Sequence, residues 1–209
     1  MYAGKSLAVA DFAGAGFLGR EISAVGSSMV ANASDGRGAF DRVVLPVGPA
    51  RLYVDLTGAS TPVRAKVDLP GIVALAVTAA DSDARLDWAS SLSMGTPVFI
   101  VQGDEPWLGR ARAGVVAIQD RGLPPDERKE AIRVVRRHEQ VHVLQYDFSA
   151  TAWGEPLERR LLQHVPGGPT VNRYVDVGLH VALWGGLRLL YPSGYGPWEH
   201  EALFLVPQQ

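Results

Sequence analysis

Two histidines and a glutamate stand close together in the segment His138-Glu139-Gln140-Val141-His142. If this segment is helical, residues four apart lie on one face, so both imidazoles can reach one metal ion. The glutamate after the first histidine lies to the side of that metal, where a water would sit. Zinc lowers the pKa of such a water to near 7, so a carboxylate can accept its proton. The segment therefore predicts a zinc site with His138 and His142 as ligands and Glu139 as general base.

The sequence before the motif indicates a helix that turns both histidines inward. Ala131, Val134 and Val135 form an apolar stripe, and the same stripe continues through His138 and His142. Two buried imidazoles need polar partners, and a shared cation satisfies both. The alternative is a chance occurrence of the motif on a solvent-exposed helix, which the inward phase of the stripe disfavours.

This part of the chain resembles the zincin metallopeptidases. Their longer motif has uncharged residues between the two histidines and apolar residues after the second. Gln140, Val141, Val143 and Leu144 agree with that pattern, and Arg136 departs from it. The resemblance covers the motif helix and part of the C-terminal third of the chain. There is also a loose resemblance to short bacterial zincin-like proteins of unknown role.

The third ligand separates the classes of zincins. The metzincin class would need a glycine and a histidine where this chain has Gln145 and Phe148. The gluzincin class takes a glutamate from a later helix. The segment that begins with Glu199 and ends with Ala202 resembles its Glu-x-Glu-Ala-Asp sequence. This resemblance implies that Glu199 is the third zinc ligand.

Several residues stay open for the remaining parts of the site. The aspartate that completes the family sequence is replaced by Leu203, so the contact that orients the first histidine must come from elsewhere. Glu201 is the alternative third ligand. Less favoured ligands are His164, His180 and Glu158, and candidate donors to a developing oxyanion are Tyr195, His200 and His180.

Composition limits the other classes of function. The chain has 209 residues and a formal net charge of -2, so no basic field favours nucleic acid as a partner. It has no cysteine, so a metal must be held by histidines and carboxylates. We find no evident signal peptide and no apolar run of membrane-spanning length. We therefore expect a location in the cytoplasm or at the periphery of a membrane.

Hydrophobic periodicity divides the chain into three regions and predicts an α+β fold. Residues 1–38 have helical spacing, with small residues that permit close packing, and form an N-terminal helical segment. Residues 39–120 alternate with a period of two and predict a small antiparallel β region with one solvated face; the run at 72–78 is among its strand candidates. Residues 121–209 predict a helical zincin-like region, with helices at about 124–146, 156–164 and 171–190. Residues 39–209 could also form one domain.

Together these features predict a zinc-dependent hydrolase, and the resemblance implies a gluzincin-type metallopeptidase that acts on a peptide or protein. The alternative is a non-catalytic zincin-like subunit of a larger, membrane-associated assembly. Three features favour this alternative. Leu203 replaces the family aspartate, the sequence does not require any one residue as the oxyanion donor, and the N-terminal helical segment suits packing against a partner protein.

Overall fold

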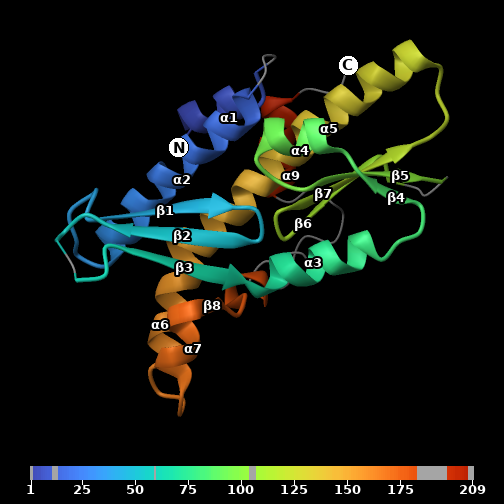
Figure 1. Cartoon of the computed structure of the whole chain (residues 1–209). Coiled ribbons are helices and arrows are strands. Elements are labelled where there is room, and N and C mark those ends of the chain that lie inside the picture. Colours follow the sequence, from blue (N-terminus) through green and yellow to red (C-terminus); the bar gives the residue numbers. More distant parts are fainter. Residues whose placement is uncertain (1, 11–13, 59, 104–106, 183–196, 207–209) are drawn as a thin grey trace.

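The computed structural model describes residues 2–10, 14–58, 60–103, 107–182 and 197–206, which form an α+β fold (Figure 1). The first half contains α1 (Tyr2–Ala8), α2 (Ala15–Ser34), β1 (Arg42–Val47), β2 (Ala50–Asp55), β3 (Val63–Asp68), α3 (Leu69–Ala79), β4 (Ala84–Leu86), α4 (Trp88–Met94) and β5 (Val98–Gln102). The second half contains β6 (Gly109–Arg112), β7 (Val115–Asp120), α5 (Pro125–Ser149), the π-helical turn η1 (Ala150–Gly154), α6 (Glu155–Leu162), α7 (Gly168–Tyr174), β8 (Val175–Asp176) and α9 (Pro197–Leu205).

The strands form two four-stranded sheets. The first has the order β1-β2-β3-β8 and the second has the order β4-β5-β7-β6. Most neighbours are antiparallel, as the sequence predicts, but β3 pairs with β8 and β5 pairs with β7 in parallel. The β region is therefore mixed rather than wholly antiparallel. A long segment that contains several helices connects β3 to β8, whereas β5 is connected to β7 through the edge strand β6.

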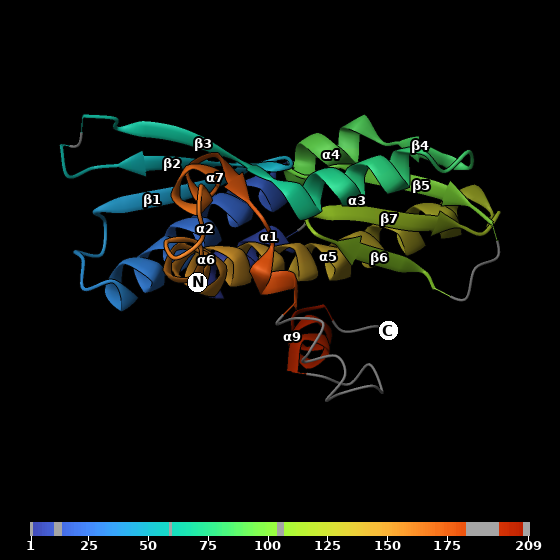
Figure 2. The same cartoon turned by 90° about the horizontal axis from the view of Figure 1, so that it is seen from below.

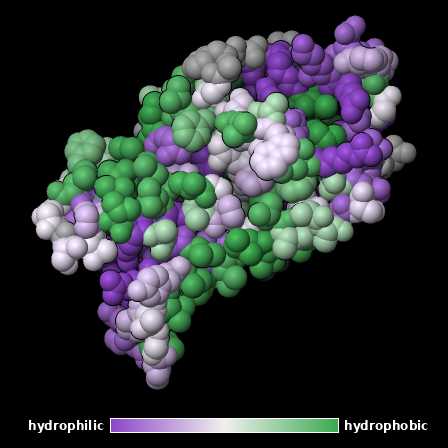
Figure 3. Space-filling view, in the orientation of Figure 1, coloured by the Kyte–Doolittle hydropathy of each residue, from purple (hydrophilic) through white to green (hydrophobic). Residues whose placement is uncertain are grey.

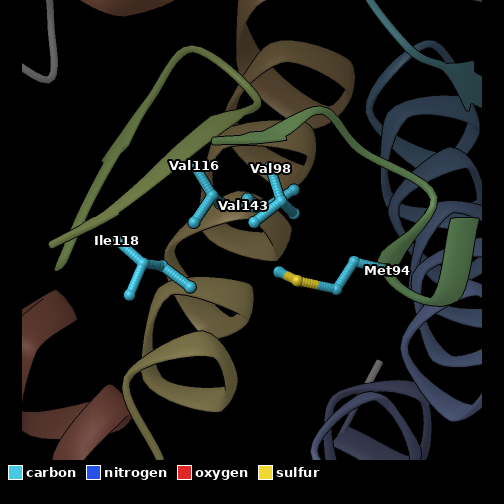
Figure 4. Close-up of a cluster of buried hydrophobic side chains, with 5 residues drawn as sticks. All are labelled: Met94, Val98, Val116, Ile118 and Val143. Atoms are coloured by element: carbon cyan, nitrogen blue, oxygen red, sulfur yellow. The ribbon is translucent and has the colours of Figure 1, made fainter. Parts of the chain in front are cut away.

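The long helix α5 runs beneath the sheets and contacts elements from both halves of the chain (Figure 2). The second sheet packs on α5 through β6 and β7, whereas β1 packs on α2. Met94, Val98, Val116, Ile118 and Val143 form a buried apolar cluster between α4, β5, β7 and α5 (Figure 4). This cluster fixes the second sheet against the part of α5 that contains the two histidines.

The first sheet has its polar side chains inside. Arg51 and Tyr53 on β2 are 2% exposed, and Lys66 on β3 is 1% exposed, whereas Val63 and Val67 are half exposed. The predicted alternation with a period of two is present, but the apolar face points outward. The charged face points inward because its side chains have partners there, such as the bond of 2.8 Å from Arg42 to Glu155.

The predicted strand at residues 72–78 is wrong, because this run lies within α3. Asp68 caps the helix by accepting a hydrogen bond from Gly71 N, and Pro70 stands in the first turn. Both are helix-start signals. The run has no helical periodicity because α3 is apolar all round and Gly71 is its one buried residue.

The continuous helix predicted for residues 171–190 is also wrong in its described part. The helix α7 ends at Tyr174, and the extended pair β8 follows it. Gly178 has a φ of 81°, which breaks the helical path before residues 179–182 become helical again. Residues 183–190 lie outside the described ranges. No helix in those ranges is both long and apolar enough to cross a bilayer.

The helix α2 buries its small residues, and α1 packs against them. Gly4 and Gly19 lie where the two helices are closest, and a Cβ at Gly19 would stand 2.2 Å from the backbone nitrogen of Ala8. The larger apolar residues of α2 are half exposed on the other side, for example Leu18 and Ile22. The small-residue face therefore packs within this chain.

We predict that Gly19→Val lowers the free energy of unfolding by about 1–3 kcal/mol, because the added side chain forces α1 away from α2. The matched control is Ile22→Ser on the exposed side of α2, which should stay within about 0.5 kcal/mol of the wild type. Urea unfolding followed by circular dichroism measures both. Equal effects of the two substitutions would contradict this close helix contact.

Candidate metal centre

Helix α5 presents a polar inner face in its second half. The helix begins with a proline in its first turn and with Asp126 and Glu127 close to its N-terminus, both of which favour helix initiation. His138 and Glu139 are 7% and 6% exposed, and His142 lies one turn later on the same face. The sequence prediction that both histidines turn inward agrees with this placement.

The two histidines and Glu199 converge on one point. Nε2 of His138 lies 3.0 Å from Oε1 of Glu199, and Nε2 of His142 lies 3.1 Å from Oε2 of Glu199. The two Nε2 atoms are 3.2 Å apart. Ligand atoms around a tetrahedral zinc ion, with bonds of about 2.0–2.1 Å, lie about 3.3 Å from one another. The three donor atoms thus have the chemistry and nearly the spacing that a zinc ion requires.

Helix α9 brings Glu199 to this point from far along the chain. Ala202 and Val206 pack on Val141 of α5, and Leu205 and Val9 lie beside them. Because Val141 stands between the two histidines on the helix, this contact aligns the start of α9 with them. The apolar cluster therefore sets the position of the third donor.

The pKa values of the three groups reflect their contact. Burial and the neighbouring His142 lower the pKa of His138. Burial opposes a charge on His142 as well, but the hydrogen bond to Glu199 and the charge of Glu139 outweigh it and raise the pKa of His142. The same bond to His142 lowers the pKa of Glu199. The opposite shifts in the pKa values of His142 and Glu199 thus follow from their mutual contact, in a place that a divalent cation would fill.

Glu139 lies beside the three donors and against strand β6. Burial raises the pKa of Glu139 to about 7, the charge of Glu199 adds to this, and His142 and the backbone of Ala111 lower it in part. A Cβ at Gly109 would stand 2.7 Å from Oε1 of Glu139, so the glycine lets the strand approach the carboxylate. A carboxylate with such a pKa can accept and return a proton near neutral pH.

A series of hydrogen-bonded side chains holds His142 through its other ring nitrogen, Nδ1. Nδ1 of His142 lies 2.7 Å from Oε1 of Gln145, and Nε2 of Gln145 donates to Oε2 of Glu201 at 2.9 Å. Lys5 of α1 donates to the other oxygen of Glu201. Glu201, the alternative third ligand, is therefore placed behind the histidine rather than among the metal donors. Nδ1 of His138 is buried and has no partner among the described residues.

The other predicted candidates lie elsewhere. His164 is exposed after α6, where it contacts Gln163. Glu158 and His180 belong to a separate buried cluster. Tyr195 and the side chain of His200 lie outside the described residues. The sequence analysis did not predict the roles of Gln145 and Lys5. The position of Gln145, three residues after His142 on the helix, could have indicated its contact with that histidine. No sequence signal indicates the role of Lys5.

The three donors open into a cleft of about 1980 Å³. One wall consists of α5 and strand β6, and the opposite wall is formed by the apolar helix α3, whose residues Leu69, Val73 and Val77 line it. Clefts for small molecules commonly measure about 300–1,000 Å³, so this one can hold a longer ligand.

Comparison with protein-family models gives no match for this chain, and neither curated proteins nor solved structures give a significant one.

We predict that Gln145→Ala weakens zinc binding about 10- to 100-fold, because it removes the partner that orients His142. Competition with a chelator of known affinity measures the dissociation constant. Gln163→Ala, at an exposed glutamine, is the control and should leave the affinity unchanged. A folded Gln145→Ala protein with the affinity of the wild type would contradict the orienting role.

Proposed function

We propose that this protein is a zinc-dependent hydrolase and that it cleaves peptide bonds. The observation that carries the proposal is the approach of three metal-donor side chains, whose nearest donor atoms lie 3.0–3.2 Å apart in each pair, on the wall of a long cleft. The buried Glu139 stands beside them as the general base. This arrangement provides for metal-assisted attack of water on a carbonyl group.

Each chain residue has one task in this reaction. His138, His142 and Glu199 would hold Zn²⁺, which would supply a Lewis acid that lowers the pKa of a water molecule to near 7. Glu139 accepts the proton of the attacking water and returns it to the leaving amine. The backbone N–H of Ala111 bonds to Glu139 and holds its carboxylate toward the cleft.

Strand β6 supports a peptide as the substrate. It is an edge of the second sheet, it lines the cleft, and it lies directly against Glu139. An extended peptide can add to such an edge by backbone hydrogen bonds, which places its carbonyl groups along the strand. A peptide bound in this way would have its scissile bond beside the three metal-donor side chains.

The wall of the cleft that α3 forms favours substrates with apolar side chains. Val73 and Val77 of α3 are more than half exposed although they line the cleft. Figure 3 shows hydrophobic side chains gathered along this part of the surface. An apolar side chain of the substrate would cover them and gain the free energy of burial, about 25 cal/mol per Å².

We predict that Glu139→Gln abolishes peptide hydrolysis while the zinc content and the fold persist, because the amide cannot accept a proton. Glu199→Ala should lose activity and the zinc ion held by His138 and His142, since it removes a ligand of that ion. Fluorogenic peptides and mass spectrometric metal analysis give the two readouts. Glu21→Gln, outside the cleft, is the matched control. Full activity of the Glu139→Gln variant would exclude the proposed mechanism.

We also predict that Val73→Asp lowers kcat/KM for peptides with apolar side chains about tenfold, which corresponds to 1.4 kcal/mol of lost binding. The control is Ile72→Asp, because Ile72 is exposed on the same helix but does not line the cleft. Steady-state kinetics with apolar and polar peptides measures the difference. Equal losses for both variants would show that α3 does not contact the substrate.

A second candidate function is a non-catalytic module of an assembly. The outer face of the first sheet favours it, because Val47, Leu56, Val63 and Val67 are 46–60% exposed there. An apolar face of this kind suits contact with another protein. The Glu139→Gln variant separates the two functions, since an assembly role does not need a general base.

A further inference from the structure

A second cluster of ligand-type side chains is buried between α6 and β8. Glu158, Asp176 and His180 each offer one donor atom, and these atoms all lie within 4.8 Å of one another. Their exposed fractions are 1%, 5% and 1%. None of the three belongs to the group formed by His138, His142 and Glu199.

The imidazole of His180 makes no hydrogen bond to any of the described residues. Both of its ring nitrogens and Oε2 of Glu158 are buried without a hydrogen bond among the described residues. The nearest carboxylate oxygen to the ring in an ion-pair contact is Oδ1 of Asp176, 3.8 Å from Nδ1, which is too long for a hydrogen bond. Buried polar atoms are almost always satisfied in native proteins, so these orphaned atoms require a partner.

The backbone is arranged to hold the cluster in place. Oε1 of Glu158 accepts hydrogen bonds from the backbone nitrogens of Gly178 and Leu179, at 2.8 and 3.1 Å. This fixes the carboxylate with its other oxygen free. A Cβ at Gly154 would lie 2.9 Å from Nδ1 of His180, so the glycine leaves room for the ring against η1.

Arg51 contacts this cluster, and it is already engaged. Its guanidinium pairs with Asp68 and with Oδ2 of Asp176. Its one positive charge thus faces two carboxylates, and the charge of the buried Lys66, which donates to Asn172, also acts on Glu158. Burial and the charge of Arg51 lower the pKa of His180 to about 3, so the ring is neutral and keeps a lone pair for a metal.

We propose that Glu158, Asp176 and His180 bind a second zinc ion, which has a structural role. One imidazole and two carboxylates form a donor set that suits zinc, whereas calcium and magnesium prefer oxygen ligands alone. The ion satisfies one ring nitrogen of His180 and Oε2 of Glu158, and it joins α6 to β8 and the helical residues 179–182. This site does not depend on the catalytic proposal, because the two groups share no residue.

The test compares zinc content per folded chain by mass spectrometry. We expect two zinc ions in the wild type, one in the double variant His138→Ala/His142→Ala, and one in His180→Ala. The control His164→Ala, at an exposed histidine, should keep two. An unchanged zinc content in folded His180→Ala would overturn the second site, whatever the result for the first site.

A further measurement covers the case in which His180→Ala fails to fold. The double variant His138→Ala/His142→Ala keeps the second cluster intact, so its melting temperature should rise by several degrees when zinc replaces a chelator, because the ion binds only the folded state. A folded double variant that contains no zinc and shows no such rise would overturn the proposal.

Discussion

Buried polar side chains on the inner face of α5 must find partners, and this constraint decides which elements surround the helix. Asp147 pairs with Arg20 of α2 at 2.6 Å, and the hydroxyl of Tyr146 donates to Asp68 at the end of β3 at 2.8 Å. Gln145 takes its partner from α9. Breaking one such buried pair leaves an uncompensated group, at a cost of about 3–5 kcal/mol. The helices and sheets are therefore placed by charge as much as by apolar contact.

The same constraint explains the unusual orientation of the first sheet. The arginines of β1 and β2 point inward because they form ion pairs there. Arg42 pairs with Glu155, and Arg51 pairs with Asp68 and Asp176. Since successive side chains of a strand point to opposite faces, the apolar residues must then turn outward. The exposed apolar face thus follows from the ionic interior together with the alternation of side chains along each strand.

Local patterns in the sequence predict those parts of the structure that depend on local geometry. The positions of His138, Glu139 and His142 follow from helical spacing, and family resemblance points to Glu199, which α9 brings beside them. The direction of the first sheet could not be predicted, because a period of two does not say which face is buried. The run in α3 is apolar all round, so its sequence predicts a strand rather than the helix that it forms. The contact between Lys5 and Glu201 has no local signal at all.

The chain of contacts from Lys5 through Glu201 and Gln145 to His142 joins segments that lie very far apart in the sequence. Contacts of such separation form late in folding, because closing a long loop costs entropy before the contact compensates for it. During synthesis the two histidines are made well before the carboxylate of Glu199. A partly made chain therefore holds only two of the three proposed donors, so the proposed metal site would be complete only when the fold is complete.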